Sequence, residues 1–280
     1  MSWVKRELST LEIPPLKRFG QHFLIDTSVR DTLVQQAALT SSDTVLEIGP
    51  GLGFLTTAIA QYAGRVIAIE KDRTLATYLR KKFSNHSNVT IVQGDALETP
   101  IPDSSKIVSS PPYNISSKLI LTILRSRFNS AMLLLQTEFA RRLHAPAGSR
   151  DYGRLTVMFQ CGGSLRLISQ VPPSAFYPSP KVDSSIVRIE PLKDLPAIED
   201  KAFFVDLVRV LFTQRRRRLK KVLINYLSQQ YQEYINEISA SIDVPEKRVF
   251  EMSSQELMHL SNQITHALAK QGARENSLGN

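Results

Sequence analysis

Apolar runs of strand length alternate with helical spacing along the middle of the chain. Helical spacing occupies residues 54–63 and 72–83. The apolar runs are TVLEIG (44–49), RVIAIE (65–70), VTIVQGD (89–95), KIVSS (106–110) and AMLLLQ (131–136). Strands that are apolar throughout and separated by amphipathic helices are typical of a parallel sheet covered on both faces. The pattern predicts a doubly wound α/β domain.

The pattern changes after residue 150. A helical stretch at 153–160 precedes two strand-like runs, LRLISQV (165–171) and VDSSIVRI (182–189), which the Pro-rich segment PPSAFYPSPK separates. Two such runs around a Pro-rich loop predict an antiparallel hairpin at one side of the sheet.

The segment PLKDLPAIEDK (191–201) has the composition of a linker, and the apolar spacing after it is helical as far as residue 268. A chain of 280 residues exceeds the usual size of one domain. We therefore predict an α/β domain over 1–190 and a smaller all-α domain over 191–280.

Charge and cysteine content narrow the class of protein. The chain has 35 Lys and Arg against 26 Asp and Glu, a net charge of +9, which suits a polyanionic partner such as nucleic acid. A single cysteine, Cys161, excludes an internal disulfide and fits a reducing compartment. Residues 1–24 contain no long apolar run, so we expect no membrane anchor and a cytoplasmic location. We also expect a monomer, since no spare apolar helix face stands out.

The segment EIGPGLGFLT (47–56) is the strongest local signal for a ligand. It follows an apolar strand and opens a helix, where glycines let the backbone approach a ligand beyond the end of the strand. The dinucleotide fingerprint would place its third glycine at position 54, which is Phe54 here. The spacing favours a nucleotide-type ligand at Gly49 and Gly51 and argues against NAD.

An acid ends each of the next two strands. Glu70 closes RVIAIE, where a carboxylate can accept hydrogen bonds from both ribose hydroxyls of an adenosine-containing cofactor. Asp95 in QGDAL can accept from an adenine amino group. A lone acid at such a position is more often a helix cap. A Gly loop, Glu70 and Asp95 on consecutive strands form an ordered set, which predicts a bound adenosine nucleoside.

The stretch SSPPYN (109–114) directly follows the fourth strand. Its bland interpretation is a turn, because proline fixes φ and keeps the preceding residue out of the helical region. At the same sheet edge as the Gly loop, it also suits amine chemistry. An exocyclic adenine or cytosine amine is a poor nucleophile, and acceptors for its hydrogens would activate it and orient it toward a methyl group. We predict Ser110 and a carbonyl of Pro111 or Pro112 as these acceptors, Tyr113 as a stacking face for a flipped base, and no metal.

Together, EIGPGLGFLT, the acid in VIAIEKD, QGDAL and the Ser-Pro-Pro-Tyr tetrapeptide resemble an S-adenosylmethionine-dependent amino methyltransferase. Five further blocks narrow the resemblance: KRFGQHFL (17–24), PPYNISS (111–117), YGRLTVMFQ (152–160), VPPSAFYPSPKVDSSIVR (171–188) and LFTQRRRRLKKVL (211–223). In this combination the chain resembles the KsgA/Dim1 family of ribosomal RNA adenine dimethyltransferases over residues 17–265. The long block at 171–188 is far more specific for this family than the Gly loop is.

The resemblance implies a Rossmann-like methyltransferase sheet that uses S-adenosylmethionine. It implies methyl transfer to N6 of two adjacent adenosines near the 3′ end of small-subunit rRNA, within an assembling small ribosomal subunit. The target-amine tetrapeptide maps to Ser110 through Tyr113, and Phe176 would be the second face of a stacking sandwich around the flipped adenine. The implied cofactor contacts are His22, Leu24, Gly49, Glu70 and Asp95.

A dense basic run lies in the helical part of the chain. Between Lys201 and Asn225 there are eight basic residues and one acid, Asp206. Such a run is most often a solvated helix face, but this density favours contacts with RNA phosphates, which position a partner without specifying its sequence. The candidate RNA-binding residues are Arg215, Arg216, Arg217, Arg218, Lys220 and Lys221.

Ser110 stands where the family usually has an asparagine in Asn-Leu/Ile-Pro-Tyr. Its hydroxyl is shorter than an amide and both donates and accepts. Two alternatives therefore stay open. One is a non-catalytic RNA-binding assembly or transcription factor that keeps the fold. The other is a DNA amino methyltransferase, because Ser-Pro-Pro tetrapeptides also resemble those of cytosine-N4 enzymes. The flanking blocks favour the rRNA adenine enzyme.

Overall fold

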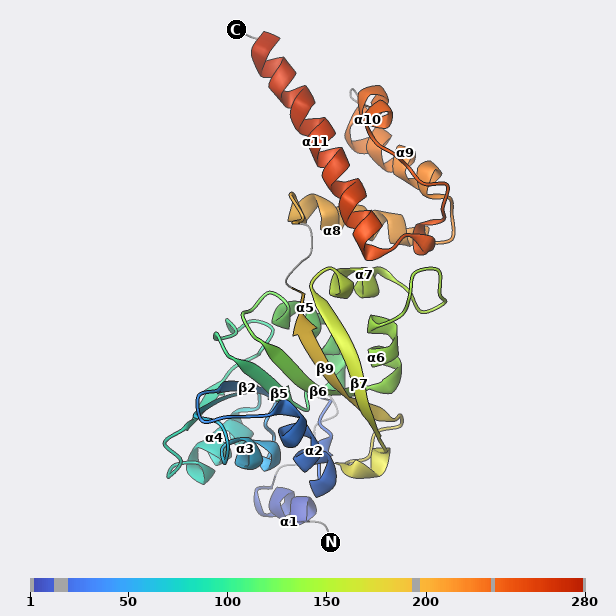
Figure 1. Cartoon of the computed structure of the whole chain (residues 1–280). Coiled ribbons are helices and arrows are strands. Elements are labelled where there is room, and N and C mark those ends of the chain that lie inside the picture. The colour runs from blue at the N-terminus through green and yellow to red at the C-terminus, as the bar shows by residue number, and fades with distance from the viewer. Residues whose placement is uncertain (1–2, 13–19, 193–196, 233–234, 279–280) are drawn as a thin grey trace. The chain divides into compact units, whose positions relative to one another are not determined.

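The computed structural model describes residues 3–12, 20–192, 197–232 and 235–278. The chain divides into two compact units (Figure 1). The first comprises Met1–Ala140 and Gly163–Pro191, and the second comprises Arg141–Gly162 and Leu192–Asn280. This division differs from the sequence-based domains at Arg141–Gly162, which we assigned to the α/β part. The difference arises because Tyr152 and Val157 pack in the helical core, a partnership that helical spacing alone does not reveal.

Within the described residues, the first unit is built on a sheet of seven strands in the order β4–β3–β2–β5–β6–β9–β7. The strands are β2 (Thr44–Ile48), β3 (Arg65–Glu70), β4 (Val89–Gln93), β5 (Lys106–Ser109), β6 (Ser130–Gln136), β7 (Gly163–Val171) and β9 (Ser184–Pro191). Strands β2 to β6 pair in parallel, whereas β9 pairs antiparallel with both β6 and β7. The predicted α/β sheet and its terminal hairpin are confirmed.

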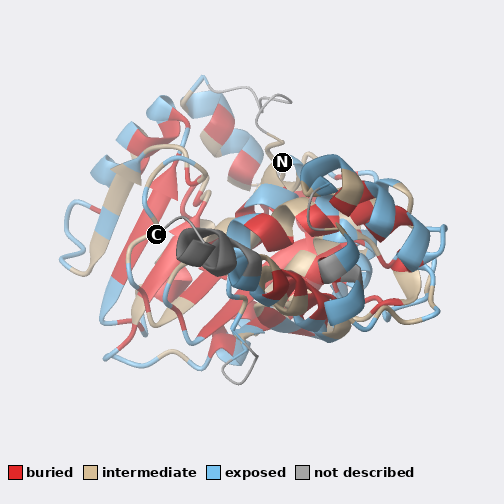
Figure 2. Cartoon of the chain, turned by 90° about the horizontal axis from the view of Figure 1, so that it is seen from above, coloured by how far each residue is buried: buried red, intermediate tan, exposed pale blue. Residues whose placement is uncertain are grey.

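The central strands are buried along their length, as Figure 2 shows. Such strands bury side chains on both faces, which explains why their sequences do not alternate between apolar and polar residues. Helix α2 begins after Asp26 and α4 begins after Asp72, and each aspartate accepts hydrogen bonds from two backbone N–H groups of the first turn. The helices of this unit after α1 are α2 (Thr27–Ala37), α3 (Phe54–Ile59), α4 (Arg73–Lys82), α5 (Ser116–Ile123) and α6 (Thr137–Leu143), the last of which ends in the second unit.

Three short elements before and beside the sheet have no counterpart in the sequence analysis. Helix α1 spans Trp3–Thr10, strand β1 spans Phe23–Leu24 and strand β8 spans Phe176–Tyr177. The strands β1 and β8 pair antiparallel, with Leu24 opposite Phe176. Strands of two residues carry no periodicity, so this pairing joins the predicted cofactor segment to the predicted base-stacking segment without a sequence signal.

The second unit is helical within the described ranges. Its elements are α7 (Arg154–Gln160), α8 (Lys201–Thr213), α9 (Leu219–Gln230), α10 (Ile235–Ser241), the 3₁₀ turn η5 (Val249–Glu251) and α11 (Ser254–Leu278). They enclose an apolar core in which Leu207, Leu227 and Leu257 are fully buried. Residues 193–196 of the predicted linker lie outside the described residues. No helix of the described chain is long and apolar enough to cross a membrane.

The basic run is not part of one helix. Within this part of the chain, where the sequence predicts helical spacing, α9 begins only at Leu219, and 214–216 form a turn after α8. The start is delayed because Arg218 has an extended ψ and forms a backbone bridge with Arg248.

Candidate active site

A cavity lies at the carboxyl ends of β2, β3 and β5 in the first unit. Parallel strands bring these ends to one edge of the sheet, which is why residues far apart in sequence meet there. Phe176 is not among the residues that line the cavity. The predicted site residues that line it are His22, Leu24, Gly49, Gly51, Glu70, Asp95, Ser110, Pro111, Pro112 and Tyr113.

The Gly loop between β2 and α3 requires glycine for two reasons. Gly49 has a φ of 70° and Gly51 a φ of 60°, both in the left-handed region that side chains disfavour. A Cβ at Gly49 would lie 3.2 Å from Pro112 Cδ, and one at Gly51 would lie 3.0 Å from the Phe23 ring. The loop therefore packs tightly against the tetrapeptide on one side and the β1 segment on the other.

Glu70 ties the Gly loop to the end of β3. Its Oε2 accepts from the Gly51 N–H at 3.1 Å, and its Oε1 accepts from the Asp72 N–H at 2.8 Å. The side chain is buried, and this burial raises the pKa of the Glu70 carboxyl to about 7. Each oxygen keeps a lone pair for a ligand hydroxyl, as the ribose role requires.

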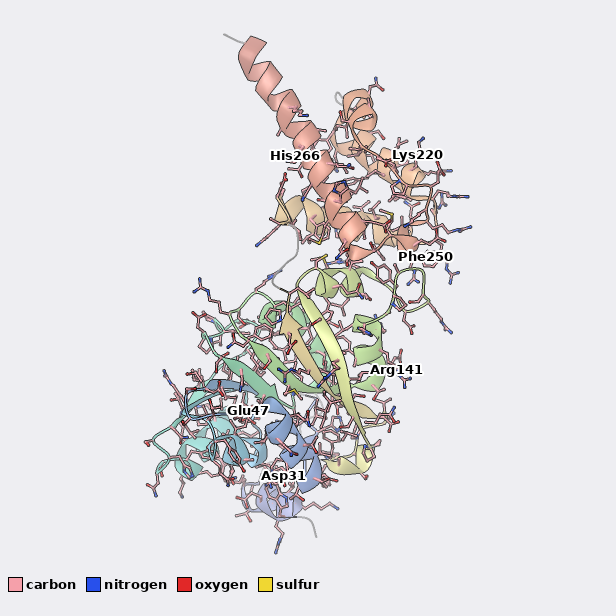
Figure 3. All side chains as sticks on the ribbon, in the orientation of Figure 1. Asp31, Glu47, Arg141, Lys220, Phe250 and His266 are labelled. Carbon is pink, nitrogen blue, oxygen red and sulfur yellow. The ribbon has the colours of Figure 1, made fainter. Side chains whose placement is uncertain are left out.

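Glu47 is a cavity residue that the sequence analysis did not single out. It is 1% exposed near the end of β2, and Figure 3 labels its side chain. Burial raises the pKa of its carboxyl to about 8, so the group is mainly neutral at pH 7. The Thr56 hydroxyl beside it lowers the pKa of this carboxyl by less than burial raises it. A carboxyl group inside an otherwise apolar strand, TVLEI, was the signal that could have identified it.

Asp95 forms an ion pair with Lys71, a residue that the sequence analysis did not single out. Its Oδ2 accepts from Lys71 Nζ at 2.6 Å and its Oδ1 accepts from the Leu97 N–H at 2.9 Å. The bond from Lys71 is the main reason that the pKa of Asp95 lies below its usual value. Lys71 follows Glu70 directly and also lines the cavity. Asp95 is thus an ionised acceptor at this edge of the sheet.

The two serines before the proline pair differ. Ser109 is fully buried, and its hydroxyl donates to the Ile48 carbonyl at 2.6 Å, which fixes the end of β5 against β2. The hydroxyl of Ser110 has no hydrogen-bond partner within the described part of the chain. Ser110 is therefore the serine that is available to a ligand.

Tyr113 is enclosed by protein groups. Its hydroxyl lies 2.6 Å from Ser184 Oγ, and its ring stacks on His22 at 5.7 Å with an interplanar angle of 26°. His22 Nδ1 lies 2.6 Å from the Pro178 carbonyl oxygen, so Nδ1 carries the hydrogen and donates.

The Tyr113 and Phe176 rings lie edge to face, 6.3 Å apart at 73°, and Phe176 is 2% exposed. The two rings do not face each other across an open slot for a base. The stacking role of Phe176 stays a prediction and requires these rings to separate and turn.

The basic run of the second unit has two kinds of side chain. Arg215 donates to the Ser149 and Arg150 carbonyls at 3.3 and 2.9 Å, and its guanidinium lies 5.5 Å from the Phe250 ring. Arg218 donates to the Glu246 carbonyl at 3.2 Å. By contrast, four exposed side chains have no hydrogen-bond or ion-pair partner in the described ranges. One of them, Lys220 on α9, is labelled in Figure 3. These four are Arg216, Arg217, Lys220 and Lys221.

Comparison with known proteins decides the family. The model described as ribosomal RNA adenine dimethylase matches residues 16–265. The chain belongs to this family. A probable ribosomal RNA small subunit methyltransferase A from Thermococcus onnurineus is 42% identical over 246 residues, covering 86% of this chain and 89% of that protein. Its counterpart from Methanosarcina acetivorans is 37% identical and covers 88% of this chain and 92% of that protein.

Solved structures place the fold in the same class. A dimethyladenosine transferase from Plasmodium falciparum superposes with a TM-score of 0.77 at 28% identity, covering 88% of this chain and 98% of that one. The 23S rRNA methyltransferase ErmE superposes with a TM-score of 0.62 at 29% identity, covering 87% and 99%. The family resemblance and the methyltransferase fold are confirmed, and the chain is an rRNA-modifying methyltransferase rather than a DNA enzyme.

Proposed function

We propose that this enzyme transfers methyl groups from S-adenosylmethionine to N6 of two adjacent adenosines near the 3′ end of small-subunit rRNA. The observation that carries the proposal is the single cavity that gathers the Gly loop, Glu70, Asp95 and the Ser110–Tyr113 tetrapeptide. We further propose that it acts as a cytoplasmic monomer on an assembling small ribosomal subunit. The similarity to small-subunit methyltransferases supports this substrate over the 23S rRNA of the more distant structural neighbour.

The residues fit an adenosine cofactor. Glu70 would accept from the ribose hydroxyls and Asp95 from the adenine amine, while Ile69 and Ala96 provide apolar walls between them. Gly49 and Gly51 also line the cavity, and their left-handed φ angles shape the loop around it. When bound there, S-adenosylmethionine supplies an electrophilic methyl group.

The tetrapeptide would prepare the target amine. Ser110 Oγ would accept one hydrogen of N6, and the carbonyl of Pro111 or Pro112 would accept the other, so that the nitrogen lone pair would point into the cavity. The prolines fix these acceptors, because their φ angles are restricted. Ser110 then serves in place of the asparagine that is usual in the family.

The helical unit would hold the rRNA. Arg216, Arg217, Lys220 and Lys221 are free to contact phosphates, whereas Arg215 stabilises the turn at 149–150. An Arg216→Ala/Arg217→Ala variant should weaken RNA binding and lower the salt slope by roughly 0.7–0.9 per lost phosphate contact. Filter binding across a salt series measures this, with exposed Arg73→Ala/Arg80→Ala in the first unit as the charge-matched control. An unchanged slope would contradict the assignment.

The function is tested with labelled S-adenosylmethionine and small subunits from cells that lack the modification. Primer extension locates the product, and we expect label at two adjacent adenosines near the 3′ end. A Ser110→Asn variant with much higher activity than the parent would favour the decayed, non-catalytic alternative. Cofactor binding without label on subunits would contradict the proposed activity.

A further inference from the structure

Helix α1 reaches the cavity from outside the family-matched residues. The family model begins at residue 16, whereas α1 spans Trp3–Thr10. Trp3 nevertheless lines the cavity together with the Gly loop. Its ring centroid lies 5.2 Å from that of Phe54, the first residue of α3, at an interplanar angle of 42°. The chain thus adds an aromatic wall that the matched motifs do not include.

Apolar burial holds α1 in this place. Val4 is 0% exposed and Leu8 is 4% exposed, although α1 has only eight residues. They belong to one buried cluster with Leu52 of the Gly loop and Leu75 of α4. An isolated helix of this length is unstable in water, so the packing is what keeps α1 helical.

Polar contacts anchor α1 at two further points. The Tyr78 hydroxyl on α4 donates to Glu7 Oε1 at 2.7 Å. The Lys5 ammonium lies 5.0 Å from the centre of the Tyr177 ring on β8. The helix therefore connects the element beside the Gly loop to the segment that carries Phe176.

Lys82, at the end of α4, holds the Gly loop beside α1. Lys82 Nζ donates to the Leu52 carbonyl at 2.8 Å. Desolvation lowers the pKa of Lys82, and the negative charge of Glu7 on α1 acts against this shift.

We propose that α1 is part of the cofactor site, with Trp3 as a wall that contacts a bound adenosine sulfonium or thioether and Glu7 as a positioning residue that anchors α1 to α4 through Tyr78. This inference rests on the proposed cofactor site. It adds a binding residue that lies outside the family-matched span and that no strand-end motif supplies. The role predicts that the affinity for the nucleoside depends on a residue at the start of the chain.

The chain offers a direct reporter, since Trp3 is its single tryptophan. Selective excitation of tryptophan therefore follows one pocket residue while S-adenosylhomocysteine is added. Calorimetry measures the same binding without relying on fluorescence. We expect Trp3 emission to change and saturate with the same dissociation constant that calorimetry gives. In Trp3→Ala we expect affinity to fall about five- to tenfold, because an aromatic contact with the ligand is lost. Trp3→Phe keeps a ring and serves if the alanine variant folds poorly, with an expected loss of about twofold.

Two further variants distinguish a direct contact of Trp3 with the ligand from an effect on how firmly α1 is held. Ser9→Ala on the exposed face of α1 should bind like the parent. Tyr78→Phe removes the bond to Glu7 and should weaken binding about threefold while the Trp3 emission still responds. Calorimetric binding with silent Trp3 emission and parental affinity in Trp3→Ala would overturn the role of α1 and leave the cofactor site intact. Absence of calorimetric binding in the parent would overturn both proposals.

Discussion

The two sides of the cavity differ in how far their side chains already stack on or bond to other protein groups instead of being open to a ligand. On the cofactor side, the Gly loop has its left-handed backbone in place. Glu70 is held by backbone N–H groups and Asp95 by a backbone N–H and Lys71, and their oxygens keep lone pairs for a ligand. On the target-base side, the Tyr113 ring is stacked on His22 and its hydroxyl is paired with Ser184.

This difference indicates an order of events. A nucleoside can bind to a preformed set of acceptors without rearrangement, which keeps the entropic cost of binding low. A flipped base must instead displace aromatic contacts between Tyr113, His22 and Phe176. We infer that cofactor binding precedes base insertion, and that changes on the two sides separate into effects on affinity and effects on turnover.

The largest effect is expected from Glu70→Ala. The variant removes the acceptor for both ribose hydroxyls and leaves the Gly51 N–H without its partner. Two hydrogen bonds to a charged group, at about 1.5–3 kcal/mol each, correspond to a loss of affinity of at least about 100-fold. Calorimetry with S-adenosylhomocysteine measures it, and exposed Glu138→Ala is the control for loss of one acid. Parental affinity in Glu70→Ala would refute the assignment of the cofactor side.

On the base side, Tyr113→Ala should lower methyl transfer to small subunits by about 10- to 100-fold, since stacking on a base contributes about 1–3 kcal/mol. The cofactor dissociation constant should change by less than about threefold, because the ribose and adenine acceptors remain. Single-turnover transfer and calorimetry give the two numbers. Tyr62→Ala, at a side chain that is 55% exposed, is the control. If Tyr113→Ala lowers cofactor affinity as much as it lowers the transfer rate, the division into a cofactor side and a base side is wrong.

Cofactor affinity should depend on pH through Glu70. Burial raises the pKa of this carboxyl from an ordinary 4.5 to about 7, so folding favours the neutral form, and stability falls as pH rises from about 4.5 to about 7. Ribose hydroxyls donate best to the ionised form, so affinity should rise about tenfold between pH 6 and 8 and then level off. Calorimetry in two buffers of different ionisation enthalpy detects the released proton. Glu70→Gln should abolish the rise, and a rise that persists in this variant would point to Glu47 instead.

The cofactor side was predictable from sequence, whereas much of the base side was not. Gly49, Glu70 and Asp95 follow strands whose apolar runs are plain, and parallel topology brings strand ends together whatever the helices do. Glu47 escaped notice because its burial depends on the neighbouring strands, although an acid inside TVLEI was a visible signal.

The contacts of Tyr113 depend on tertiary structure. Ser184 and Phe176 lie far from it in sequence, and the two-residue pairing of β1 with β8 has no periodic signature. The same holds for α1, whose burial against Leu52 and Leu75 decides that it forms at all. The tetrapeptide suggested the role of Tyr113 and the family resemblance that of Phe176, but neither could supply the edge-to-face geometry of the two rings.

The smallest effect is expected from Tyr113→Phe, which keeps the ring and removes only the hydroxyl that pairs with Ser184. If the enclosed arrangement is a resting state that the base must open, losing this bond loosens the ring but leaves Ser184 unpaired in the buried sheet. A neutral hydrogen bond contributes about 0.5–1.5 kcal/mol, so the melting temperature should fall slightly while transfer changes by less than about fivefold. Ser184→Ala removes the other partner and should match Tyr113→Phe in transfer rate. If Tyr113→Phe lowers methyl transfer as much as Tyr113→Ala does, the hydroxyl and not the ring is what methyl transfer requires. That result would overturn the stacking role of the ring.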